Sequence, residues 1–142
     1  ITNRGREIFI DGSSEDEHIA EKVIEAINFG FSIQNALLIK KEELNFTIMN
    51  IKEHTPSKNF KRIKGRIIGK GGKNLETISR LTDSFFEIRG NKVGIISDPE
   101  KMKNAQEAII LLSRGAKHKR VYSILEKNQL RPIMDLGLKK LD

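Results

Sequence analysis

Residues 67–75 read Ile67-Ile68-Gly69-Lys70-Gly71-Gly72-Lys73-Asn74-Leu75, and they are the most informative part of this chain. A Gly-x-x-Gly loop stands between two helical patterns, and aliphatic residues on each side can anchor both helices. Glycine lets a backbone approach a sugar-phosphate chain because no Cβ is in the way. The second helix begins at this loop, so its positive dipole end and the charges of Lys70 and Lys73 face the same place. The segment therefore predicts a backbone turn that binds phosphate.

Two other glycine motifs do not fit the same residues. A Walker loop needs Gly-Lys-Ser/Thr after a glycine and four residues, but Asn74 follows Lys73 and Ile67 occupies the first glycine position. The dinucleotide fingerprint fails as well, because Asn74 stands at its last glycine. The remaining alternative is a flexible turn between helices, which the aliphatic frame and the local basic charge make less favoured.

The apolar pattern outward from the loop predicts a defined order of elements. Leu44, Phe46 and Ile48 alternate as a half-buried strand does, and later apolar residues recur at helical spacing. The predicted elements are a strand from Leu44 to Ile51, a helix from Thr55-Pro56 to Ile68, a helix over Leu75, Ile78 and Leu81, two strands joined at Gly90-Asn91, and a helix ending at Gly115. The order is strand, helix, helix, strand, strand, helix.

The first part of the chain repeats the last of these elements at a distance of 85 residues. A shift of this size places Ile8, Ile10, Glu15, Ala20, Ile24 and Gly30 on Val93, Ile95, Glu100, Ala105, Ile109 and Gly115, with five identities. Each copy predicts a short strand, a helix capped by glycine and a second helix. Residues 1–43 are therefore interpreted as the rear part of a second module of the same kind.

The net charge of +7 divides unevenly between these two parts. Residues 1–43 carry five basic and nine acidic side chains, a balance of −4, whereas residues 44–142 carry twenty-one and ten, a balance of +11. Residues 58–80 hold eight basic side chains opposed only by Glu76. A solvated lysine face and a polyanionic partner both explain such a run, and the loop within it favours the partner.

The segment from about Leu44 to Leu112 resembles a type I KH domain, an α+β fold of order βααββα in which a three-stranded sheet carries helices on one face. The narrower resemblance is to the archaeal branch of the two-KH ribosome-assembly factors, whose eukaryotic relatives are called partner of Nob. It rests on residues 65–73, on Gly90-Asn91-Lys92-Val93-Gly94-Ile95-Ile96, on Arg114-Gly115 and on residues 121–126. This resemblance implies three parts: residues 1–43 from a first KH-like module, a KH domain over residues 44–127, and a tail over residues 128–142.

The chain departs from that family pattern at two places. The Gly-x-x-Gly region of the first module is absent from these residues, and Lys117-His118-Lys119-Arg120 replaces the turn with Pro and Gly that usually follows the capped helix. The second change adds positive charge and is not expected to weaken RNA binding.

The resemblance also implies a function and its partners. We expect binding of single-stranded RNA near the 3′ end of small-subunit rRNA, within the pre-small ribosomal subunit and beside the Nob-type PIN-domain endonuclease, with no catalytic activity, no cofactor and no metal in this chain. Phosphate contacts are expected from Arg62, Lys64, Arg66, Lys70 and Lys73, with the loop backbone of Gly69, Gly71 and Gly72. Ile67, Ile68, Leu75 and Ile88 line or support the base groove, a role in the core being at least as favoured for each, and Arg89 is a weaker candidate for a base edge.

Composition and scattered polar residues limit the alternatives. Only 6% of the residues are aromatic, which disfavours a stacking platform of the RRM or OB type. The chain has no cysteine, and its short apolar runs predict no membrane span, so we expect a cytoplasmic protein, also nucleolar if the source is eukaryotic. Histidines 18, 54 and 118 are too dispersed for a local metal motif. A KH regulator of translation or mRNA stays open as the alternative, and a nuclease is less favoured.

Two regions outside the loop also carry expectations. Residues 1–43 are acidic, so we expect them to add little to RNA affinity and to pack on the KH domain or meet a protein partner. The apolar residues of the tail are expected to fold back on the repeat helices more readily than to dock on a partner.

Overall fold

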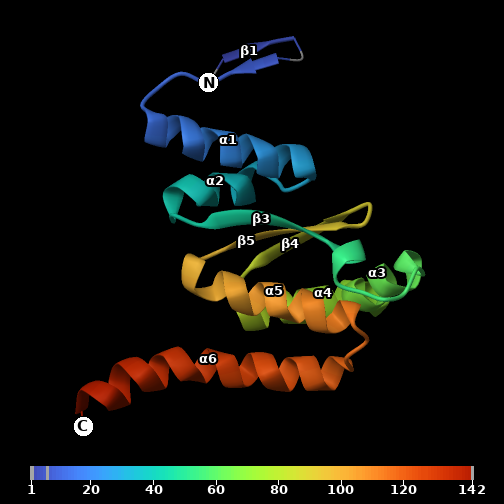
Figure 1. Ribbon diagram of the computed structural model, residues 1–142. Helices are drawn as coiled ribbons and strands as arrows, with labels where there is room; N and C mark the ends of the chain where they lie inside the picture. Colours follow the sequence, from blue (N-terminus) through green and yellow to red (C-terminus); the bar gives the residue numbers. More distant parts are fainter. Residues whose placement is uncertain (1, 6, 142) are drawn as a thin grey trace.

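The computed structural model describes the backbone of residues 2–5 and 7–141, and side chains for residues 7–129. Figure 1 shows a stack of layers, from a hairpin through two helices and a sheet to a group of helices and a last long helix. The elements are β1 Thr2–Arg4, β2 Glu7–Phe9, α1 Ser14–Phe29, α2 Ile33–Lys41, β3 Asn45–Asn50, η1 Ile51–Glu53, α3 Phe60–Ile68, η2 Lys70–Gly72, α4 Lys73–Thr82, β4 Phe85–Arg89, β5 Lys92–Ser97, α5 Pro99–Ser113 and α6 His118–Leu141. No helix within the described residues is both long and apolar enough to cross a membrane.

The central sheet consists of the three predicted strands. Its strands run in the order β3-β5-β4, and both pairings are antiparallel. Gly90 and Asn91 form the turn between β4 and β5, where Arg89 pairs with Lys92. Along the chain, β3 is followed by α3, α4, β4, β5 and α5, which is the order βααββα. The predicted α+β fold is therefore confirmed.

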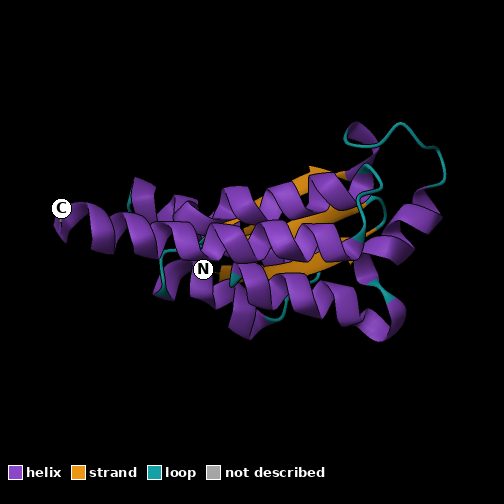
Figure 2. Ribbon diagram, turned by 90° about the horizontal axis from the view of Figure 1, so that it is seen from below, coloured by secondary structure: helices purple, strands orange, loops and turns teal. Residues whose placement is uncertain are grey.

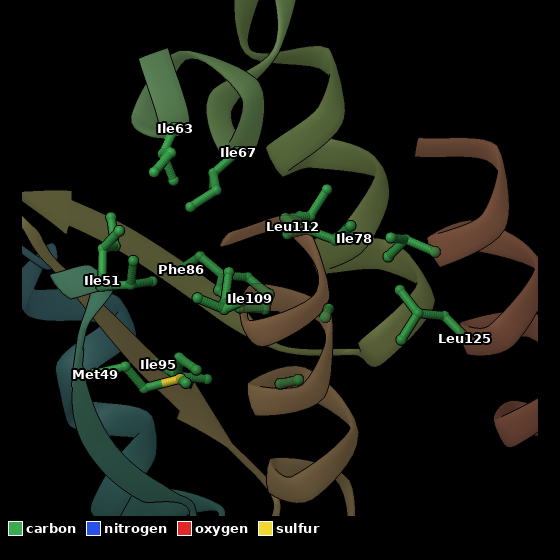
Figure 3. Packing of buried hydrophobic residues seen from close by; sticks show 14 of the residues in the cluster. Met49, Ile51, Ile63, Ile67, Ile78, Phe86, Ile95, Ile109, Leu112 and Leu125 are labelled. Carbon is green, nitrogen blue, oxygen red and sulfur yellow. The ribbon is translucent and has the colours of Figure 1, made fainter. Parts of the chain in front are cut away.

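The larger hydrophobic core lies between this sheet and the helices beneath it. Ile95 of β5 and Ile109 of α5 are fully buried, and the labelled residues in Figure 3 converge from the sheet, α3, α4, α5 and α6. Val121 and Leu125 of α6 belong to the same core and are fully buried. The first turns of α6 are therefore part of the KH unit. Figure 2, seen from below, shows this long C-terminal helix lying over the other helices.

A second core covers the other face of the same sheet. Phe46 of β3 and Ile96 of β5 pack there against α1 and α2. The rings of Phe29, Phe31 and Phe46 form a cluster whose centroids lie 5.8 to 6.3 Å apart. The acidic first part of the chain thus packs on the KH domain, which is one of the two roles expected for it.

The repeat extends to individual hydrogen bonds. The strand pairs Arg4↔Glu7 and Arg89↔Lys92 are related by the 85-residue shift, as are the helix N-caps Ser13 and Asp98. After the capping glycines, the Phe31 amide donates to Ala26 O and the Ala116 amide donates to Leu111 O, again 85 residues apart. The predicted order of strand, helix and second helix is confirmed in both copies, with Gly30 as the C-cap of α1 and Gly115 one residue after Arg114, the C-cap of α5.

One predicted helix start is wrong. The helix expected from Thr55-Pro56 begins at Phe60 instead, and the Asn59 side chain caps it by accepting from the Arg62 amide at 3.2 Å. Thr55 Oγ1 accepts from the Ser57 amide and Ser57 Oγ from the Asn59 amide, both at 3.1 Å. These hydroxyls form two successive turns, a local alternative to helix that serine and threonine readily offer.

The last helix differs from the predicted division of the chain. α6 runs without a break through the expected boundary at residue 128. The side chains at residues 130–142, which include all of the apolar residues of the tail, lie outside the described residues. Their docking therefore stays a prediction.

Candidate functional site

The Gly-x-x-Gly loop joins α3 to α4 through a short turn of left-handed glycines. Gly69, Gly71 and Gly72 have φ angles of 76°, 62° and 76°, which residues with a side chain rarely adopt. Lys70 stands between them and is exposed. Gly72 is the N-cap of α4 and offers no side chain to that helix, so the positive end of α4 faces the loop without a side-chain cap.

The glycines of the loop differ in what surrounds them. A Cβ on Gly69 would lie 2.6 Å from Asn74 Cβ and 2.8 Å from Asn74 N, so this glycine permits close packing. A Cβ on Gly71 or Gly72 would meet nothing within 4 Å. The backbone at these two positions is therefore bare on the side where a ligand would approach.

Asn74 supports the loop from below, although sequence reasoning used it only to exclude other motifs. Its side chain is buried, and its Nδ2 donates to Ile67 O at 2.7 Å and to Arg66 O at 3.3 Å. Its Oδ1 accepts from the Tyr122 hydroxyl at 2.5 Å. His118 Nε2 lies 2.9 Å from the same Arg66 O. The last carbonyls of α3, which a broken helix leaves without partners, are thereby held by α4 and α6.

A sequence signal for this support existed. A helix that stops at glycine leaves carbonyl groups in need of donors, and Asn74 is the nearest amide side chain in the following helix. The contribution of Tyr122 and His118 carried no such signal, because they are 48 and 52 residues away from their partners.

We expect Tyr122→Phe to lower the free energy of unfolding by about 1 kcal/mol, because it leaves Asn74 Oδ1 without its donor in a partly buried place. Urea denaturation measures the change. Ser123→Ala is the control on the same turn of α6: Ser123 is exposed, and we expect a change within about 0.5 kcal/mol. A Tyr122→Phe protein as stable as the parent would contradict a supporting role for this hydroxyl.

The predicted cations divide into two groups. Lys70 and Lys73 are exposed at the loop, and Lys64 lies on α3 one turn before Ile68. Arg66 is directed elsewhere: its guanidinium donates to Leu112 O at 2.9 Å and to Ala116 O at 2.5 Å. It stabilises the carbonyl end of α5, a favourable place for a cation. We therefore remove Arg66 from the proposed phosphate ligands.

Arg89 also has partners within the protein. Its Nη1 donates to Asn28 O at 2.6 Å and to Phe29 O at 3.2 Å, at the end of α1. The guanidinium predicted for a base edge thus joins the KH sheet to the first module. We assign it this structural role in place of the predicted one. Arg62, at the start of α3, is exposed and lies far along the helix from the loop.

The aliphatic residues divide in the same way. Ile67 is fully buried in the larger core, so it supports the loop and has no surface for a base. Ile68 is 36% exposed, and Leu75 is partly buried against that core. Ile88 is also partly buried there. Ile68, Leu75 and Ile88 therefore remain the candidates for an apolar groove.

The described residues hold no group of three His, Asp or Glu side chains placed to bind a metal ion. The site consists instead of bare backbone, a helix N-terminus, lysines and aliphatic surface. Such a set suits a phosphodiester backbone with bases on an apolar groove, which is how a KH domain holds about four nucleotides of a single strand.

The comparison with family models decides the relationship. Residues 45–130 match the model for the second KH domain of PNO1, described as a eukaryotic-type KH domain, or KH domain of type I. The chain belongs to the PNO1 family. The resemblance found in the sequence is thus confirmed, and β3 to the early part of α6 is its second KH domain.

Individual relatives of this PNO1-family chain agree. A KH domain-containing protein of Methanocaldococcus jannaschii is 35% identical over 127 residues, which are 87% of this chain and 56% of that protein. The pre-rRNA-processing protein pno1 of Aspergillus fumigatus is 29% identical over 134 residues, 89% of this chain and 53% of that protein. The chain therefore spans about half the length of these curated relatives.

A solved structure of similar fold comes from Pyrococcus horikoshii. It is the crystal structure of an a/eIF2alpha, aDim2p and rRNA complex, matched with a TM-score of 0.78 and 28% sequence identity. The match covers 84% of this chain and 66% of that one. The layers described for this PNO1-family chain are thus shared with a protein crystallised with rRNA.

Proposed function

We propose that this chain is an RNA-binding ribosome biogenesis factor of the small subunit. In this proposal it binds single-stranded rRNA near the 3′ end, and it assists 3′-end maturation beside the Nob-type endonuclease. The observation that carries the proposal is the loop of three left-handed glycines with Lys70 and Lys73 at the start of α4. Relatives named as pre-rRNA-processing proteins, and a neighbour crystallised with rRNA, support the choice of RNA.

The loop and the helix N-terminus hold the sugar-phosphate backbone in this mechanism. The amides of bare backbone donate to phosphate oxygens, and the two lysines add charge. Ile68, Leu75 and Ile88 offer apolar surface to the bases. The chain itself holds RNA and leaves its phosphodiester bonds intact, so cleavage belongs to the neighbouring endonuclease.

Crosslinking in cells tests the target RNA. The chain, expressed in place of its relative, is expected to crosslink to the 3′ region of small-subunit rRNA. A variant with Lys70→Asp and Gly71→Asp, expressed at the same level, is the control and should lose these crosslinks. Crosslinks spread over messenger RNAs would contradict the proposal and favour a KH regulator of translation.

The partner and the processing step need their own experiment. A pull-down with the purified Nob-type endonuclease should retain the chain, and depletion of the chain should accumulate small-subunit precursors extended at the 3′ end. The purified chain alone should leave precursor rRNA uncut. Normal 3′ ends after depletion would contradict the processing role, and metal-dependent cleavage by the chain alone would favour an enzyme.

A further inference from the structure

A hollow separate from the loop lies where the start of α3 meets the end of α5. Its lining includes two arginines of α3, one arginine that follows α5 and the exposed or half-buried hydroxyl residues before α3, namely Arg62, Arg66, Arg114, Thr55 and Ser57. The hydroxyl of Ser113 also lines it, but this side chain is buried and donates to Ile109 O. No carboxylate is among the residues that line it in the described part of the chain. The described residues form two ion pairs, Lys22 with Glu25 and Lys101 with Asp83, and neither lies at this hollow.

The three arginines of the hollow differ in their hydrogen bonding. Arg66 is held by Leu112 O and Ala116 O, so it fixes α3 against the end of α5. Arg62 lies one helical turn before Arg66 on the same face of α3, and Arg114 lies between the two carbonyl acceptors in the sequence. The hydrogen bonds of Arg66 join α3 to the end of α5, and they therefore keep Arg62 and Arg114 at the same hollow although both side chains are positively charged.

Both of these outer arginines are exposed and available to a ligand. Neither guanidinium makes a hydrogen bond or an ion pair with the side chains and backbone that the structure describes. Two like charges kept close together repel each other, and a bound anion offsets this repulsion because it attracts both of them. A guanidinium presents paired donors that match the oxygens of a phosphate group.

The hydroxyl groups in the hollow complete a set of donors. Thr55 Oγ1 and Ser57 Oγ each accept a backbone amide at 3.1 Å. Their oxygen atoms are thus engaged as acceptors, and their hydrogens remain to be donated to an incoming anion. The hollow also lies at the N-terminal turn of α3, whose dipole favours negative charge.

Arg62 of the hollow lies near the start of α3, whereas the Gly-x-x-Gly loop follows the last residue of that helix. Seven residues separate Arg62 from Gly69, and a helix of that length spans about 10 Å. Exposed Lys117, Lys119 and Arg120 continue the positive surface at the start of α6. A chain of phosphates that crosses the loop is therefore within reach of a second cationic site on the same unit.

We propose that this hollow binds a phosphate group of the RNA outside the few nucleotides held at the loop. The proposal rests on RNA binding as the function. It predicts that RNA length decides how much the hollow contributes, because a strand of about four nucleotides fills the groove alone.

Fluorescence anisotropy with two RNAs tests this on the full chain. One RNA has about five nucleotides and the other about 16, so that only the second extends beyond the groove. Arg62→Gln with Arg114→Gln removes the two free charges and leaves Arg66 in place. We expect affinity for the long RNA to fall at least fivefold, affinity for the short RNA to stay within about twofold, and the salt dependence to weaken by about 0.7 per lost contact.

Matched variants separate this site from net charge and from the loop. Lys41→Gln with Lys103→Gln removes two exposed charges elsewhere and should leave both RNAs bound as by the parent. Arg62→Lys with Arg114→Lys keeps the charge without the paired donors and should fall between parent and glutamine variant. The thermal midpoint of the glutamine variant should equal that of the parent, because both side chains are exposed.

The possible failures are distinguishable. Parent-like binding of the long RNA by the Arg62→Gln, Arg114→Gln protein would overturn the phosphate site, and so would an equal loss for both RNAs. Failure of the proposed function would show in a different variant, since Lys70→Asp with Gly71→Asp would then bind both RNAs as tightly as the parent.

Discussion

Replacement of Lys70 and Gly71 by aspartate is expected to lower the affinity for a short single-stranded RNA at least tenfold, which is about 1.4 kcal/mol. The two substitutions place carboxylates where the loop is proposed to hold phosphate. They also remove one of the two lysines nearest to it. Anisotropy with an RNA of about five nucleotides measures the effect, since such an RNA contacts little beyond the groove.

The fold should tolerate this pair of changes. A Cβ at position 71 meets nothing within 4 Å, and aspartate is among the residues that adopt the left-handed conformation required there. The thermal midpoint is therefore expected to stay near that of the parent. Lys70→Gln with Gly71→Asn is the control of equal size without carboxylates, and it should lose less affinity. Parent-like binding by the aspartate variant would remove the loop from the RNA site.

Gly94→Ala is expected to lower the free energy of unfolding by about 2 kcal/mol, because it adds a methyl group where there is no room. A Cβ at this position would lie 2.7 Å from two ring carbons of Phe29 and 2.9 Å from one of Phe31. These rings belong to the second core, so α1 and α2 must shift or the sheet must bend. Denaturation in urea measures the change.

Gly65→Ala is the matched control, since it makes the same chemical change at an open place. A Cβ on Gly65 meets nothing within 4 Å, and this glycine lies inside α3. Alanine there should raise the free energy of unfolding by about 0.5 to 1 kcal/mol. The two variants are thus expected to have opposite signs. A Gly94→Ala protein as stable as the parent would show that the phenylalanine rings do not press on β5.

The second core also changes how the acidic part of the chain should be tested. A chain that began at Leu44 would expose Phe46 and Ile96 to water. Its RNA affinity would therefore mix the effect of charge with the effect of an uncovered sheet. Glu15→Gln with Asp16→Asn in the full chain avoids this, because both carboxylates are exposed, and we expect RNA affinity to stay within about twofold.

Local patterns were sufficient to predict the fold from the sequence. The βααββα order follows from apolar periodicity and from the glycines that follow α3 and α5, and the repeat follows from a single shift. The start of α3 differs from the prediction because two hydroxyl residues form turns where the sequence pattern predicts a helix cap. Such competition between turn and helix involves small energy differences that a cap motif alone does not reveal.

The residues of the site were harder to predict than its location. Ile67 and Ile68 are adjacent and chemically equal, yet one is fully buried and the other is 36% exposed. Arg66 and Lys70 carry the same charge, but the partners of Arg66 are 46 and 50 residues away. Periodicity and charge describe the neighbourhood of a residue in the chain. Partners that distant become visible only when the helices are packed.

These distant partners have a consequence for the order in which the chain is made. Arg66, Asn74 and the loop between them are synthesised well before Ala116, His118 and Tyr122, the residues that brace them. A nascent chain that has reached only α5 contains the complete Gly-x-x-Gly sequence without the helix that supports it. We therefore expect the loop to reach its braced conformation only after α6 has left the ribosome and docked, so that the proposed RNA site is completed after nearly the whole KH domain has been synthesised.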